Sequence, residues 1–113
     1  MKAIVYERYG SPDVLHVKEV EKPVPKDNEV LIKVHAASAN ASDCEFLRGT
    51  PLYTRIWGLL KPKNQILGSD IAGRVEAVGR KVKQFQPGDA VFGDILEWWG
   101  GFAEYVCAPE GAL

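Results

Sequence analysis

Five side chains able to take part in chemistry lie close together in the stretch ASANASDCEFLRG, residues 37–49. The five residues are Asn40, Ser42, Asp43, Cys44 and Glu45. An amide, a hydroxyl, a thiol and two carboxylates at this spacing allow three interpretations. They are a metal site, a catalytic site without metal, and the capped beginning of a short helix.

The helix interpretation explains most of the stretch. Ser42 and Glu45 have the three-residue spacing of a capping box, in which each side chain bonds the backbone N–H of the other residue. Asp43 would lie in the first turn, where the positive end of the helix dipole favours a carboxylate. Gly49 would end the helix, because glycine accepts the left-handed conformation common after a last turn. The pattern therefore predicts a short helix between Ser42 and Gly49.

A zinc site is not expected from the residue types. Catalytic zinc needs three Cys, His or carboxylate ligands and an open position. Cys44 has no neighbouring cysteine, and both histidines, His16 and His35, precede it in the chain. His35 also shares the expected solvent side of a strand with Lys33. The two cysteines, Cys44 and Cys107, predict free thiols in a reducing cytosol rather than a disulfide framework.

Length and composition predict one domain with a modest core. The chain has 113 residues, 46% of them apolar, and a net charge of −1. Charged residues are spread along the chain, which argues against a nucleic-acid partner or a basic membrane patch. No apolar run approaches the roughly 20 residues that cross a bilayer, and the charged beginning is not that of a signal peptide. A cytoplasmic protein is the resulting expectation.

Short runs of apolar residues, separated by Pro, Gly and Asp, predict a mainly β fold. The expected strands are residues 3–6, 14–21, 29–38, 69–79, 90–95 and 102–108. Many short strands with turn signals about every ten residues indicate a barrel or a sandwich. Gly73 lies inside one of these strands and predicts a bulge or a close backbone approach.

The strand at residues 29–38 has the clearest alternation. Its expected buried side is Val30, Ile32, Val34 and Ala36, and its expected mostly solvent-exposed side is Leu31, Lys33 and His35. The segment from Leu47 to Leu67 lacks strand signals, and a loop of this length is usually functional or mobile.

Several motifs resemble, in order and spacing, the medium-chain dehydrogenase/reductase superfamily. They are LGSDIAGRVEAVG at 67–79, FQPGDAVFG at 85–93 and GGFAEYVCAPE at 100–110, preceded by MKAIVYERYGSPDVL and EVLIKVHAASAN-SD. The resemblance covers nearly the whole chain and is nearest to the zinc-independent quinone oxidoreductase branch. It implies a GroES-like, partly open β-barrel with one or two short helices. The family's Rossmann domain, with its Gly-rich fingerprint, is absent from this sequence. The resemblance therefore implies that residues 1–113 are the N-terminal catalytic domain of a longer two-domain enzyme, inactive alone.

The resemblance also implies a site without metal. In the zinc-dependent branch a cysteine ligand stands at the position of Asn40, and a histidine–glutamate pair stands at Ser69 and Asp70. Asparagine and serine bind zinc poorly. The structural-zinc lobe is missing as well, because VFGDILEWWGG runs directly into FAEY.

The implied reaction is hydride transfer from NADP(H) or NAD(H) to a quinone, an enone or another activated carbonyl. The cofactor would be bound mainly by the domain that this chain lacks, and the full-length protein would be a homodimer. Uncharged donors would stabilise charge on the acceptor oxygen in place of zinc. The catalytic candidates are Asn40, Ser42 and Tyr53, with Asn40 also on the nicotinamide side. The candidate substrate pocket is Tyr53, Trp57 and Trp98.

Each candidate has a structural alternative. Ser42 is explained by helix capping, and burial of the ring explains Tyr53. Trp98 and Trp99 are adjacent, so they cannot both face one way on a strand and at least one should be exposed. Cys107 is expected to be a small buried apolar residue.

Two other functions stay open from the sequence. One is a non-enzymatic interaction module on the same barrel, with residues 47–67 as its binding loop. The other is a zinc alcohol dehydrogenase domain with atypical ligands.

Overall fold

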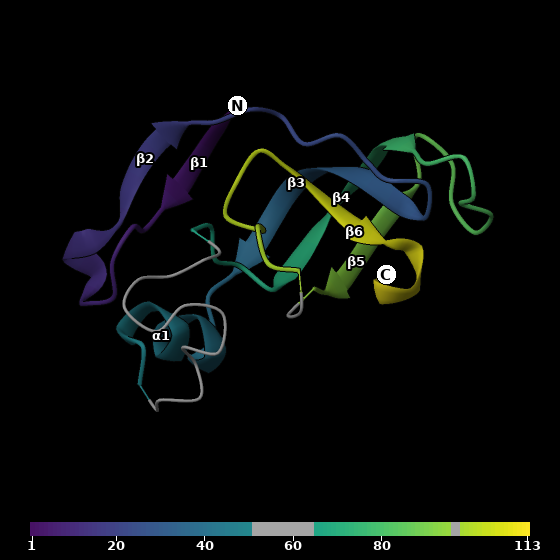
Figure 1. Ribbon diagram of the computed structural model, residues 1–113. Coiled ribbons are helices and arrows are strands. Elements are labelled where there is room, and N and C mark those ends of the chain that lie inside the picture. The colour runs from purple at the N-terminus through teal and green to yellow at the C-terminus, as the bar shows by residue number, and fades with distance from the viewer. Residues whose placement is uncertain (51–64, 96–97) are drawn as a thin grey trace.

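The computed structural model describes residues 1–50, 65–95 and 98–113, and within them it contains two antiparallel sheets and one α-helix (Figure 1). The smaller sheet pairs β1 (Lys2–Val5) with β2 (His16–Glu19). The larger sheet has the order β5-β4-β3-β6. Its strands are β3 (Glu29–Ser38), β4 (Asp70–Val78), β5 (Ala90–Asp94) and β6 (Tyr105–Pro109). The helix is α1 (Ala41–Arg48), and single 3-10 turns cover η1 (Pro12–Val14) and η3 (Glu110–Ala112).

The two sheets are joined at one edge and do not close into a complete barrel in the described part of the chain. Ala3 of β1 forms an isolated bridge with Ala103. Beside it, the backbone N–H of Ile4 donates to the carbonyl of Phe102 over 2.9 Å. The prediction of a mainly β, partly open architecture is therefore confirmed.

β3 is a central strand of the larger sheet, and its bounds are those predicted from the alternation. Val30 and Ile32 are fully buried, as expected, and Lys33 is exposed. Ala36 departs from the prediction, because it is exposed although it lies on the expected buried side. Leu31 departs in the other direction, because it is only 5% exposed although it lies on the expected solvent side. Its partner in β6, Cys107, is also half-buried there, so this side of the sheet is covered near Leu31. Burial raises the pKa of the Cys107 thiol to about 11, which keeps it protonated.

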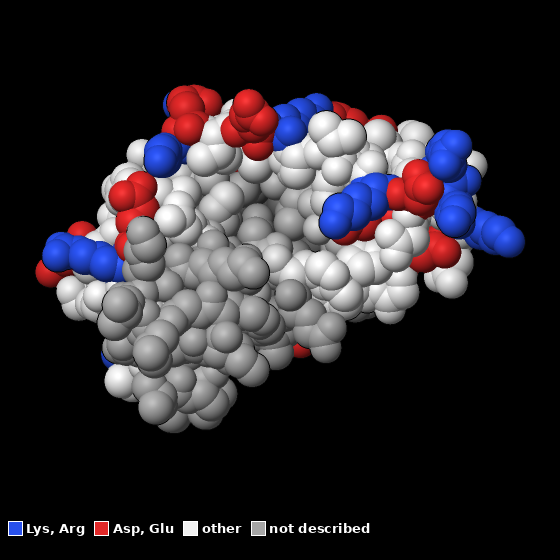
Figure 2. Space-filling view, viewed as in Figure 1, with Lys and Arg blue, Asp and Glu red and all other residues white. Residues whose placement is uncertain are grey.

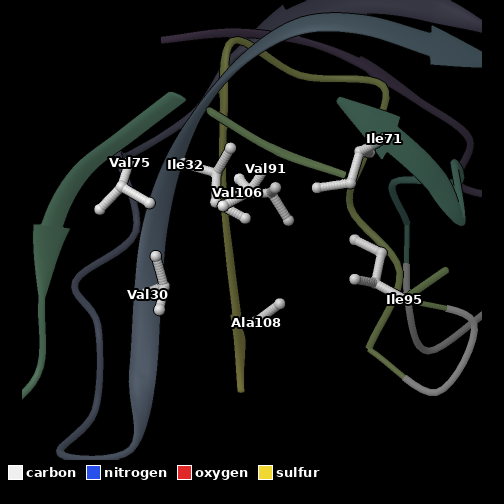
Figure 3. Close-up of a cluster of buried hydrophobic side chains, with 8 residues drawn as sticks. All are labelled: Val30, Ile32, Ile71, Val75, Val91, Ile95, Val106 and Ala108. Carbon is white, nitrogen blue, oxygen red and sulfur yellow. The ribbon is translucent and has the colours of Figure 1, made fainter. Parts of the chain in front are cut away.

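The main core lies where the strands of the larger sheet curve around one another (Figure 3). Eight buried side chains form it: Val30, Ile32, Ile71, Val75, Val91, Ile95, Val106 and Ala108. A second, smaller cluster packs α1 against the segments on either side of it. Its buried members are Tyr6, Leu47, Leu67 and Trp99. Leu47 of the helix thus packs with buried side chains from three other segments of the chain.

Gly73 lies at the close approach that the sequence predicts. A Cβ atom there would be 2.1 Å from the carbonyl oxygen of Lys33, so a larger residue cannot fit without moving the strand. On the opposite strand, Val34 pairs with Gly73 and Ala36 pairs with Ala72, so His35 is an extra residue in β3. The bulge bends β3 near its end.

Two strands begin at least two residues later than predicted, namely β2 and β6. Residue 14 belongs to η1 rather than to β2, and Leu15 closes that turn by donating to the carbonyl of Pro12. β6 begins at Tyr105 because the residues before it bond to other segments: Phe102 donates to Leu67, and Glu104 donates to Lys2. These residues join the two sheets instead of extending β6.

Acidic and basic side chains are interspersed along the rim of the face shown in Figure 2. Among the described residues there is no helix with the length and apolar character that a bilayer crossing requires.

Candidate functional site

The chain leaves β3 and enters α1 through Asn40, which is the N-cap of the helix. Asn40 has an extended backbone (φ −134°), and its Oδ1 accepts from the backbone N–H groups of Ser42 (3.0 Å) and Asp43 (3.3 Å). Asp43 Oδ2 in turn accepts from the backbone N–H of Asn40 over 2.8 Å. This is a reciprocal capping box.

The predicted box between Ser42 and Glu45 is therefore wrong by two residues. Asn40 with Asp43 has the same three-residue spacing, and only Asn40 has the extended conformation that an N-cap requires. Ser42 and Glu45 lie inside the helix. The predicted end is confirmed, because Gly49 adopts the left-handed conformation (φ 70°) and its N–H donates to the carbonyl of Glu45.

The side-chain nitrogen of Asn40 connects the helix to the beginning of β4. Nδ2 donates to Oδ2 of Asp70 over 2.7 Å and to Oγ of Ser69 over 3.3 Å. Ser69 is only 2% exposed. The amide therefore uses its oxygen for the helix cap and both of its hydrogens for the strand. We call Asn40, Ser69 and Asp70 the amide cluster.

Asp43 forms a second connection between the same two segments. Its carboxylate is 4% exposed, and Oδ1 accepts from the backbone N–H of Gly68 over 3.2 Å. Burial raises the pKa of Asp43, and the N–H donors of Asn40 and Gly68 partly offset this. The nearby carboxylates of Asp70 and Asp94 raise it further.

The strand side of this connection is fixed by close backbone packing. Gly68 has φ 103°, and a Cβ atom on it would lie 2.6 Å from the backbone nitrogen of Phe102. The carbonyl of Gly68 accepts from Gly101 over 2.9 Å, and that of Ser69 accepts from Ile95 over 2.6 Å. Only glycine satisfies both the backbone angle and the lack of space at residue 68.

Sequence reasoning missed the structural part that Asp43 and Gly68 play in this site. The sequence places Asp43 in the first helical turn, near the positive end of the dipole, and by itself predicts no role for Gly68. Glycine immediately before the two polar residues Ser69 and Asp70 is a signal that could have indicated a backbone position that only glycine can occupy.

A cavity of about 530 Å³ opens beside the amide cluster on the face of β3, β4 and β5. Its lining is Ala36, Ala37, Ser38, Asp70, Ile71, Ala72, Phe92, Gly93 and Asp94. The volume lies in the range of small-molecule pockets. Asp70 belongs to both the cavity and the cluster, and Phe92 is 80% exposed at the edge.

The other predicted site residues are not part of the cluster. Ser42 is half-buried in the first turn of α1. Trp98 is 43% exposed and lines a separate cavity of about 330 Å³ with Val5, Lys18 and other residues. Trp99 is 2% exposed, so the prediction that at least one of the two tryptophans is exposed is confirmed.

Some predictions fall outside the described residues. Tyr53 and Trp57 lie there, as does most of the loop at 47–67 that the interaction-module hypothesis requires. The roles of Tyr53, Trp57 and Trp98 in substrate binding stay predictions.

The donor set of the amide cluster does not suit zinc. Of its three side chains only the Asp70 carboxylate is a usual zinc ligand, and it already accepts from Asn40. The Asn40 oxygen is directed to the helix N–H groups, and the nitrogen of an amide has no free electron pair for a metal. In the described ranges no group of three or more His, Cys, Asp or Glu residues is arranged to hold a metal ion.

The fold and this site can be compared with known proteins. Residues 26–113 match the alcohol dehydrogenase GroES-like domain family, and the chain belongs to this family. A quinone oxidoreductase of Sus scrofa is 41% identical over 118 residues, which is 100% of this chain and 32% of that protein. A 2-methylene-furan-3-one reductase of Solanum lycopersicum is 38% identical, over 97% of this chain and 29% of the relative.

Among solved structures, the quinone oxidoreductase from Coxiella burnetii superposes with a TM-score of 0.88 at 34% identity. The match covers 99% of this chain and 35% of that one. The predicted GroES-like fold and the resemblance to quinone oxidoreductases are both confirmed. The chain spans about a third of the length of the curated relatives it matches.

Proposed function

We propose that this chain is the substrate-side domain of an oxidoreductase that passes hydride from NADPH or NADH to an activated carbonyl compound without zinc. The observation that carries the proposal is the amide cluster. One of its residues, Asp70, lines an open cavity of about 530 Å³, and its donor set is unsuited to a metal. The names of the relatives support conjugated carbonyl acceptors, a quinone in one case and a methylene-furanone in the other.

The chain's own part in this reaction is to bind and polarise the acceptor. Reduction places negative charge on the acceptor oxygen, and preorganised N–H or O–H groups stabilise that charge. Asn40, Ser42 and Tyr53 are the proposed donors. Asn40 already donates both hydrogens, so contact with the acceptor or the nicotinamide must replace one of these bonds. The 3.3 Å bond to Ser69 is the longer and weaker of the two.

The bound nicotinamide cofactor would supply the hydride. The residues described here suit only its reacting end, where Asn40 offers an amide beside the cavity. Because the sequence has no Gly-rich nucleotide fingerprint, the rest of the cofactor would be held by another domain. We propose that the whole protein is a two-domain, cytoplasmic homodimer with no nucleic-acid or membrane partner, and that residues 1–113 alone are nearly inactive.

Isotope transfer tests the proposal. The full-length protein is incubated with NADPH carrying deuterium at the transferable position, together with a quinone or a methylene-furanone. The proposal expects oxidation of the cofactor and, for the furanone, a reduced ketone with one deuterium bound to carbon. The 113-residue chain is the matched comparison and should show almost no turnover. The proposal is contradicted if the full-length protein oxidises neither NADPH nor NADH with either acceptor class.

A further inference from the structure

Asp43 does more than cap α1, because its two carboxylate oxygens bond to two different segments. Oδ2 accepts from the N–H of Asn40 at the entrance of the helix, and Oδ1 accepts from the N–H of Gly68 just before β4. A capping residue needs only the first of these bonds. The second crosses 25 positions of the sequence and is buried.

The segments that Asp43 joins are those that carry the amide cluster. Asn40 stands on one, and Ser69 and Asp70 stand on the other, next to Gly68. The strand segment is fixed by backbone hydrogen bonds, because Gly101 donates to the carbonyl of Gly68 and Ile95 donates to that of Ser69. The position of Asn40 relative to Ser69 and Asp70 therefore depends on the contacts that hold the beginning of α1 against this strand.

We propose that Asp43 is a positioning residue, whose carboxylate holds Asn40 beside Asp70, so that the amide can exchange its weaker bond to Ser69 for the acceptor while it keeps the bond to Asp70. A carboxylate suits this task because both oxygens accept hydrogen bonds. An asparagine at the same place would turn its NH2 group toward one of the two backbone N–H donors and lose that bond. The effect on turnover rests on the proposed function, whereas the effect on the Asn40 geometry does not.

The carboxylates around Asp43 give a further reason why Asn40 must be held in place. The carboxylates that face it are Asp70 of β4 and Asp94 of β5. Asn40 donates to Asp43 through its backbone and to Asp70 through its side chain, so it lies between two acidic groups. Holding Asn40 in place also keeps its N–H groups on both carboxylates.

The test compares Asp43→Asn with Asp89→Asn. Asp89 is a matched control, since its Oδ2 also accepts a backbone N–H, from Gln86, in a turn outside the site. In the 113-residue chain, NMR follows the Gly68 amide and the side-chain NH2 of Asn40. We expect both signals to move and to exchange faster in Asp43→Asn, and neither to change in Asp89→Asn. In the full-length enzyme, kcat should fall by about 10- to 100-fold with little change in KM for Asp43→Asn alone.

A folded Asp43→Asn protein with unchanged Asn40 signals would overturn the inference, as would an equal loss of kcat in both variants. If Asp43→Asn fails to fold, the wild-type chain still decides. The backbone amides of Asn40 and Gly68 should then titrate with one shared midpoint, because both donate to the Asp43 carboxylate. The Asn40 side-chain NH2, which also senses Asp70, should shift at that midpoint too, and an NH2 signal that does not respond there contradicts the proposal. If the wild-type enzyme has no oxidoreductase activity, the proposed function fails, while the NMR result continues to test the positioning role.

Discussion

The side-chain nitrogen of Asn40 lies 2.7 Å from Oδ2 of Asp70, and this bond joins the beginning of α1 to the first residue of β4. The oxygen of the same amide caps the helix. One side chain thus links local helix formation to the packing of the candidate site. Changes at Asn40 should separate these two contributions.

Replacing Asn40 by aspartate should preserve the cap and break the link. Aspartate is an equally good N-cap, but it brings a second carboxylate next to Asp70 instead of an N–H donor. We expect Asn40→Asp to be less stable than the wild type at neutral pH and to approach it in acid, where the carboxylates are protonated. Asn40→Ala should lose about 0.5–2 kcal/mol at both pH values because the cap is removed. Urea unfolding at the two pH values measures the free energy of unfolding of both variants. An Asn40→Asp protein that is as stable as the wild type at neutral pH would contradict a stabilising bond between Asn40 and Asp70.

The buried Asp43 predicts a particular sign of pH dependence. Its pKa is raised above the ordinary value of 3.8, so the folded state holds this proton more tightly than the unfolded state does. The stabilising contribution of Asp43 to the free energy of unfolding is fully present below its ordinary pKa of 3.8 and is lost as pH rises through the pKa of the folded state. The free energy of unfolding of the wild type, relative to Asp43→Asn, should therefore fall as pH increases from about 4. Chemical denaturation across this range measures it, and a relative stability that rises with pH would show the sign to be wrong.

Gly73 should tolerate no side chain. The Cβ of an alanine there would meet the carbonyl oxygen of Lys33 at 2.1 Å, so Gly73→Ala must displace β3 or β4. We expect a loss of about 1–3 kcal/mol or more. Gly111→Ala is the control, because a Cβ at Gly111 has no neighbour within 4 Å, and its stability should be unchanged or slightly higher. Equal thermal stability of the two variants would contradict the observed packing.

The adjacent tryptophans should differ sharply in their contribution to stability. Trp99 is buried and packs against Phe46 with ring centroids 4.9 Å apart, whereas Trp98 is 43% exposed. Trp99→Ala should cost about 3–5 kcal/mol, as large core truncations do. Trp98→Ala should cost less than about 1 kcal/mol. Denaturant unfolding of both variants provides the comparison, and similar losses would mean that the burial difference is not real in solution.

Local patterns predicted the parts of the fold that local interactions determine. The bounds of β3 follow from its alternation, and Gly49 and Gly73 follow from backbone requirements that only glycine meets easily. Leu31 was assigned to the solvent side because alternation treats a sheet as having one covered face. The half-buried Cys107 beside it shows that the other face is partly covered as well, which depends on tertiary packing.

The candidate site could be predicted only in part, because its connections run between distant segments. The stretch 37–49 contains two overlapping patterns with the spacing of a capping box, one starting at Asn40 and one at Ser42. Composition does not choose between them, whereas the end of β3 does, since it leaves Asn40 extended. The bonds from Asn40 to Asp70 and from Asp43 to Gly68 span 30 and 25 positions. The family resemblance places Asn40, Ser69 and Asp70 together, at the positions of the zinc site in the zinc-dependent branch. The bond from Gly68 to Asp43 is visible only in the structure.

Activation of the acceptor without a metal is the central claim, and zinc dependence of the full-length enzyme tests it most directly. The enzyme is assayed with NADPH and a quinone before and after dialysis against a chelator, and its zinc content is measured alongside. We predict zinc well below one ion per chain, with a turnover rate that neither chelation nor added zinc changes. Stoichiometric zinc, whose removal abolishes turnover and whose return restores it, would contradict the account.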